Sequence, residues 1–115
     1  MINKELVDLK RQLDSASDNL NKRILQYQSE LKTLSLGADA WVDITPNIKI
    51  GYAKHKGEWK ILINYNELGD LLSNTPIMES PRELRLLGYK NFPKLLKAIE
   101  EKAIDLLSKM NEALQ

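Results

Sequence analysis

The first third of the chain carries one apolar stripe with helical spacing. Its members recur about every 3.6 residues, and neither Pro nor Gly interrupts the chain before Gly37. The pattern predicts a long amphipathic helix over residues 1–36, and Gly37 fits a left-handed cap at its end. The stripe consists of Ile2, Leu6, Leu9, Leu13, Ala16, Leu20, Ile24, Tyr27, Leu31 and Leu34.

The period changes to two over residues 40–66, which is typical of strands with one buried face. A two-residue turn at Lys56-Gly57 would pair His55 with Glu58 and place the apolar residues of both flanking strands on one face. A slip of one residue would split that face, so the register is strongly specified. With a short strand at 41–44, we expect an antiparallel sheet of three strands with a central hairpin.

The last segment, residues 80–115, is expected to be helical. Ser80-Pro81-Arg82-Glu83 is a helix start signal, and Gly88 is expected to end a first short helix. A second helix from Phe92 has an apolar face that is wide enough to contact more than one neighbour. Between the sheet and this segment, Leu68, Leu71 and Leu72 suggest one helical turn, and Ser73-Asn74-Thr75-Pro76 suggests a loop.

These elements predict a single α+β domain over residues 1–115, with the C-terminal helix packed antiparallel on the first helix. A helix of about 35 residues is roughly 52 Å long, whereas a compact domain of this size has a radius of gyration of about 13 Å. The first helix therefore extends beyond its own globule, which favours a homodimer or higher oligomer formed through the helices. The candidate interface residues are Leu6, Leu9, Leu13, Leu20, Ile24 and Leu31.

Composition restricts the class of protein. The chain has 115 residues, 43% hydrophobic and 29% charged, with a formal net charge of +1. It has no apolar run of the roughly 20 residues that span a bilayer and no apolar signal core near Met1. We therefore expect a cytoplasmic globular protein that does not contact membranes.

Catalytic and metal-binding patterns are absent from the sequence. There is no Cys, and the one His, His55, is expected at an exposed hairpin tip, so no cofactor or metal site is predicted. The five glycines are well separated and form no phosphate-binding loop. Glu101 and Asp105 have lysines four residues away, as on an ordinary solvated helix face. We expect the protein not to be an enzyme.

Positive charge is concentrated in the middle of the chain. Residues 48–97 have a net charge of +4, whereas residues 1–47 have −1 and residues 98–115 have −2. A basic hairpin with a tryptophan could follow phosphates and stack on a base, although lysines also protect sheet edges from aggregation. The candidate binding residues for a protein partner or for DNA or RNA are Lys49, Lys54, Lys56, Trp59, Lys60, Arg82 and Arg85.

Three functional hypotheses follow from these patterns. The first is a non-enzymatic protein–protein interaction module, an adaptor, inhibitor or regulator, that oligomerises through its long helices. The alternative is a nucleic-acid-binding protein that uses the basic hairpin and the adjacent basic helix. A third hypothesis is a small-molecule pocket between the sheet and the segment 68–72.

Overall fold

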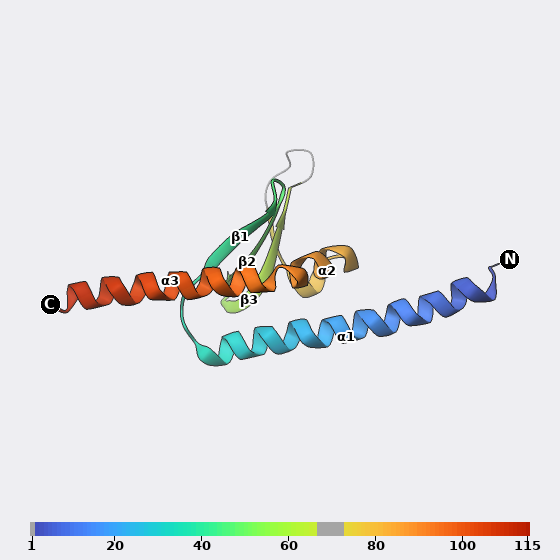
Figure 1. The fold of residues 1–115 in the computed structure, drawn as a ribbon, viewed down its shortest axis with the longest axis horizontal. Coiled ribbons are helices and arrows are strands. Elements are labelled where there is room, and N and C mark those ends of the chain that lie inside the picture. The colour runs from blue at the N-terminus through green and yellow to red at the C-terminus, as the bar shows by residue number, and fades with distance from the viewer. Residues whose placement is uncertain (1, 67–72) are drawn as a thin grey trace.

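The computed structural model describes residues 2–66 and 73–115, and these form an elongated α+β unit (Figure 1). A long helix lies along one side, a twisted sheet rises from the middle, and two further helices follow. The elements are α1 (Lys4–Leu34), β1 (Ala40–Thr45), β2 (Ile48–His55), β3 (Glu58–Tyr65), β4 (Ser73–Pro76), the short 3₁₀ helix η1 (Ile77–Glu79), α2 (Arg82–Lys90) and α3 (Phe92–Ala113).

The hairpin formed by β2 and β3 has the register that the sequence predicts. His55 pairs with Glu58, Tyr52 with Ile61 and Ile50 with Ile63. The turn has positive φ at Lys56 (51°) and at Gly57 (84°), as a two-residue hairpin turn of this kind requires. The alternation of apolar and polar residues therefore determined the pairing.

The sheet has four antiparallel strands in the order β1-β2-β3-β4, not the three that were predicted. Segment 73–76, expected to be a loop, pairs with β3 so that Leu62 lies opposite Pro76. Its Ser, Asn and Pro residues have low strand propensity, and hydrogen bonding to the β3 edge overrides that preference. The helical turn and the small-molecule pocket expected at 68–72 lie outside the described residues.

The hydrophobic core lies between one face of the sheet and the three α-helices. It joins the middle of α1, the first turns of α3 and the apolar face of the hairpin. Its fully buried members include Ile24, Ile50, Ile61, Ile77, Leu95 and Ile99.

The C-terminal helix runs parallel to α1, which corrects the predicted antiparallel packing (Figure 1). Arg82 lies beside Asp14, Tyr89 beside Arg23 and Phe92 beside Tyr27, so both chain segments advance in the same direction. The fourth strand explains the difference, because each added antiparallel strand reverses the direction in which the chain leaves the sheet.

Gly88 does not end α2, which continues to Lys90. A Cβ atom at Gly88 would lie 2.7 Å from Cδ1 of Ile77 and 3.2 Å from Cδ1 of Ile63. The missing side chain thus allows α2 to approach the core closely, which is a packing role and not a cap.

The outer face of the sheet is partly apolar. Trp41 lies directly over Gly51, where a Cβ atom would come within 2.3 Å of the indole ring. The next residue across the sheet is Leu62, which is 1% exposed. The tryptophan over the glycine accounts for the buried part of this face.

The molecule is far longer than a compact domain of its size. Its principal extents are 73 × 33 × 24 Å and its radius of gyration is 17.4 Å, against about 13 Å for a compact domain. The first turns of α1 and the last turns of α3 project from opposite ends (Figure 1). The prediction that α1 extends beyond its own globule is confirmed.

Candidate protein-interaction surface

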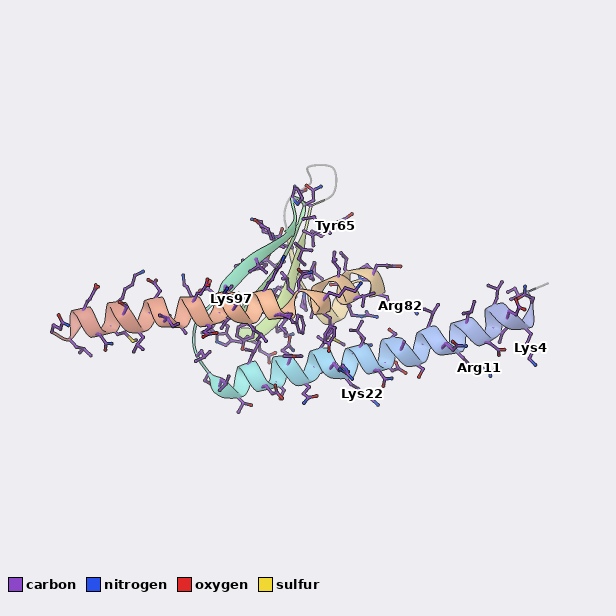
Figure 2. All side chains as sticks on the ribbon, viewed as in Figure 1. Lys4, Arg11, Lys22, Tyr65, Arg82 and Lys97 are labelled. Carbon is purple, nitrogen blue, oxygen red and sulfur yellow. The ribbon has the colours of Figure 1, made fainter. Side chains whose placement is uncertain are left out.

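Residues 2–13, here called the N-arm, carry an exposed apolar stripe. Ile2 is 78% exposed, Leu6 55%, Leu9 51% and Leu13 55%. Figure 2 shows the labelled side chains of Lys4 and Arg11 on a stretch of α1 beyond the end of α2. Among the described residues, no other element covers the first two turns of this stripe.

Local interactions hold the N-arm in a helix. The Asn3 side chain accepts a hydrogen bond from the backbone N–H of Leu6 at 2.9 Å, which caps the helix start. Lys10 forms an ion pair with Asp14 at 2.7 Å, four residues further along the helix. Hydrogen bonding to Lys10 lowers the pKa of Asp14, and the positive charges of Lys10 and Arg82 act in the same direction.

Residues 103–114, here called the C-arm, carry a second exposed stripe at the other end of the molecule. Ile104 is 59% exposed, Leu107 58%, Met110 63% and Leu114 84%. An ion pair between Lys109 and Asp105 at 3.0 Å lies on this stretch of α3. Each arm is thus an amphipathic helix of which the apolar side faces solvent.

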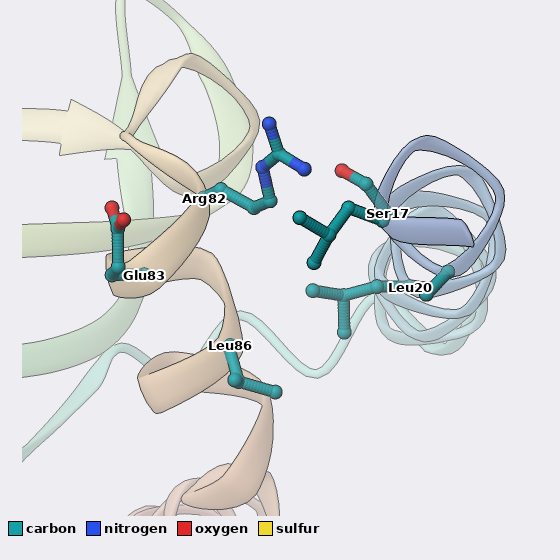
Figure 3. Close-up of a pocket in the computed structure, with 7 residues that line it drawn as sticks. Ser17, Leu20, Arg82, Glu83 and Leu86 are labelled. Atoms are coloured by element: carbon teal, nitrogen blue, oxygen red, sulfur yellow. The ribbon is translucent and has the colours of Figure 1, made fainter. Parts of the chain in front are cut away.

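A groove lies where the N-arm joins the body, the name used here for the described residues between the N-arm and residue 103 (Figure 3). It has a volume of about 450 Å³, and Leu20 of α1 and Leu86 of α2 form its apolar walls. Arg82 and Glu83 supply a polar rim, and the Arg82 guanidinium lies 3.9 Å from the Asp14 carboxylate.

A second groove, of about 370 Å³, lies where the C-arm leaves the body. α1 ends there, and the apolar face of α3 continues without it. The lining is almost wholly apolar and consists of Leu31, Leu34, Leu36, Leu96, Ile99, Glu100, Ala103, Ile104 and Leu107. Each arm stripe is therefore continuous, through a groove, with the apolar surface of the body.

Only part of the predicted oligomer interface is available for a partner. Leu6, Leu9 and Leu13 are exposed, and Leu20 is half-buried in the first groove. Ile24 and Leu31 are buried within the protomer (0% and 6% exposed), so they belong to the core, and Leu31 also lines the second groove. Both residues lie where α1 packs on the sheet and α3. Helical periodicity in the sequence does not show where along α1 that contact falls.

The sequence-based interface omitted the C-arm. Its exposed residues belong to the wide apolar face of α3, which was expected to contact more than one neighbour but was not included in the predicted interface. The parallel arrangement of α1 and α3 leaves this end of α3 without a neighbouring helix (Figure 1). The sequence feature that could have revealed the exposed C-arm is the length of the apolar pattern on α3.

Most of the predicted basic binding residues are engaged within the protomer. Lys49 lies 3.8 Å from Asp43, and Lys60 lies 3.8 Å from Glu58. The Arg85 guanidinium donates to the backbone oxygen of Ser80 at 2.8 Å and to the Ser17 hydroxyl at 3.3 Å.

The tryptophan of the hairpin is also engaged. Trp59 stacks on Tyr52, with ring centroids 5.2 Å apart. Lys54 and Lys56 are exposed at the hairpin tip, and Arg82 is on the rim of the first groove. The predicted residues are thus divided between the hairpin and α2.

Two further findings concern the described residues. No three His, Asp or Glu side chains are grouped there in a way that could hold a metal ion. The search of the same residues for membrane-spanning helices found none of sufficient length and apolar character.

Comparison of the chain with protein-family models, with curated proteins and with solved structures returns no match. The physical properties of the arms and grooves are therefore the basis on which a function can be argued.

Proposed function

We propose that this protein is a non-enzymatic protein–protein interaction module that binds helices, including those of its own copies, through the apolar faces of its two arms. The observation that carries the proposal is the pair of exposed stripes on the N-arm and the C-arm. Single exposed leucines are ordinary on protein surfaces, but contiguous apolar faces indicate an interaction surface.

The physical argument concerns the free energy of leaving these stripes in water. Burying a large aliphatic side chain contributes about 1.5–3 kcal/mol, and about half of that is still available for a residue that is half exposed. The four large side chains of one arm would therefore contribute roughly 4 kcal/mol when covered, and two arms twice as much. Burial of the matching partner residues adds to this, against an association cost of about 4–15 kcal/mol.

The shape of the site indicates the kind of partner. An amphipathic helix presents anchors at intervals of three and four residues and fits either a groove or another helix face. Both arms have that spacing, and both lead into a groove with apolar walls. A helix with a matching stripe is thus the expected ligand.

A photo-crosslinking residue placed on each arm tests the proposal. Benzoylphenylalanine would replace Leu9 or Leu107 in the full chain, expressed in cells. Ser15 on α1 and Ser108 on α3 provide matched control positions, since both are exposed and lie away from the stripes. Discrete protein adducts at positions 9 and 107 that are absent at 15 and 108 would support the proposal. The same adduct pattern at all four positions, or no adduct at any, would overturn it.

A further inference from the structure

We infer that two copies of this chain form a closed twofold dimer, in which the N-arm of each copy packs antiparallel on the C-arm of the other. This inference rests on the proposed function and specifies its partner as a second copy. Four observations support it: the positions of the arms, their spacing, their flanking residues and the polarity of their ends.

The positions of the arms fit a single twofold operation. The arms project from opposite ends of the long axis, and α1 and α3 run in the same direction (Figure 1). A twofold axis perpendicular to that long axis exchanges the two ends and reverses the helix direction. It therefore brings each N-arm to the partner's C-arm in an antiparallel orientation, and it covers both stripes of both copies at once.

The spacing of the two stripes is complementary. The N-arm stripe proceeds from Ile2 to Leu13 in steps of four, three and four residues. On the C-arm, a seam that ends at the half-buried Ala103, with the exposed Ile104 beside it, proceeds from Leu114 back to Ala103 in the same steps. Steps of three and four residues are those of a heptad repeat, in which the first and fourth positions form the contact seam between two helices. The antiparallel register pairs Ile2 with Leu114, Leu6 with Met110, Leu9 with Leu107 and Leu13 with Ala103.

The residues that flank the seams are compatible with this register. Glu5 and Lys10 flank the N-arm seam, and the corresponding C-arm positions hold uncharged residues. No like charges meet, so the pairing carries no electrostatic penalty. The flanking residues of the C-arm are Ile104, Leu106, Asn111 and Ala113.

The ends of the helices favour the antiparallel register over the parallel one. The same spacing would allow a parallel pairing, in which Leu13 meets Leu114 and copies join head to tail in an open chain. Antiparallel pairing instead places the positive N-terminal end of α1 beside the negative C-terminal end of α3, where the helix dipoles attract. It also closes the assembly at two copies, as most soluble homo-oligomers do.

Engineered cysteines test the inference, because the natural chain has none. The double variant Leu13→Cys, Ala103→Cys places the thiols together only in the antiparallel register. The matched double variant Leu13→Cys, Leu114→Cys does so only in the parallel register. Within one protomer the two arms lie at opposite ends of the molecule, so every disulfide formed joins two copies (Figure 1).

On mild oxidation, we expect the first variant to convert mostly to a covalent dimer and the second to remain mostly monomeric in a denaturing gel. A ladder of higher species from the second variant would overturn the closed dimer in favour of the open chain. Equal, weak cross-linking of both variants at concentrations where the wild-type mass is twice 13.2 kDa would overturn the arm pairing.

The result is separable from that of the photo-crosslinking experiment. Arm adducts to a different protein, together with no disulfide dimer and a monomeric mass, would overturn this inference and leave the proposed function supported. Absence of adducts at positions 9 and 107 would overturn both. The helical circular dichroism of the cysteine variants shows whether they retain the fold.

Discussion

The two ends of α1 belong to one stripe in the sequence but to two environments in the structure. Ile24 is 0% exposed against the sheet, and Leu6 is 55% exposed on the N-arm. The same contrast occurs on α3, where Ile99 is 2% exposed and Leu107 is 58% exposed. Apolar periodicity thus specifies which side of a helix is buried, whereas the length of the neighbouring elements decides how far along the helix the burial extends.

The comparison predicts that truncating a body residue and truncating an arm residue have very different effects. Ile99→Ala removes a fully buried side chain, and we expect it to lower the free energy of unfolding by about 2–5 kcal/mol. Leu107→Ala, two turns further along α3, should change the unfolding of the monomer by less than about 0.5 kcal/mol. Urea unfolding at a protein concentration low enough for monomers measures both. Equal losses would contradict the division into body and arms.

A charge on either stripe should instead weaken self-association. Leu9→Glu and Met110→Glu each place one unpaired carboxylate per chain, and so two per dimer, in the buried interface. We therefore expect each substitution to raise the dimer Kd about 100-fold or more. Light scattering over a concentration range measures the mass. The controls Ser15→Glu and Ser108→Glu add the same charge off the stripes and should leave the Kd within about threefold. Equal increases of the dimer Kd in the arm and control variants would show that an added charge weakens self-association wherever it lies, and not because it is on a stripe.

The outer face of the sheet allows a sharper test of body packing. Gly51→Ala would place a methyl group in the position of the Trp41 ring, and overpacking of this kind lowers the free energy of unfolding by about 1–3 kcal/mol. In a Trp41→Ala background the same change should be nearly neutral, since the clashing ring is absent. A double-mutant cycle by urea unfolding measures the coupling. Additive effects would mean that the indole does not restrict position 51.

The stability of the body should also decrease at alkaline pH, because Tyr52 is buried there. Burial raises the pKa of Tyr52 above its ordinary value of 10.0. The folded state therefore favours the neutral phenol, so this contribution to stability is complete below pH 10 and is lost as the pH rises through the folded pKa. Tyr52→Phe should flatten the pH dependence of the urea midpoint in that range. If the urea midpoint of Tyr52→Phe had the same pH dependence as the wild type, the loss of stability at alkaline pH would not come from Tyr52.

The sequence predicted the elements of the body better than it predicted their neighbours. Alternation of apolar residues specified the register of β2 and β3 because a slip would expose half of that face. β4 was missed because Asn74 and Pro76 do not favour a strand, and its pairing depends on the edge that β3 offers and not on the propensity of its own residues. The exposed C-arm was missed for a related reason: the direction of α3 depends on that fourth strand.

The smallest effect is expected at the hairpin tip, which belongs to the body but carries no apolar stripe. Lys54 and Lys56 are exposed, so replacing both with Glu should change the unfolding free energy by less than about 0.5 kcal/mol per site and leave the dimer mass unchanged. The hairpin tryptophan, Trp59, is partly buried and has one face of its ring stacked on Tyr52, which leaves at most the other face for a base.

We therefore expect no retardation of DNA or RNA by the wild-type protein at low salt, the condition that most favours phosphate contacts. Retardation that weakens steeply with added salt and disappears in the Lys54→Glu, Lys56→Glu variant would reverse the comparison. The hairpin tip would then be the functional surface, and the arms would serve to bring two such tips onto one nucleic acid.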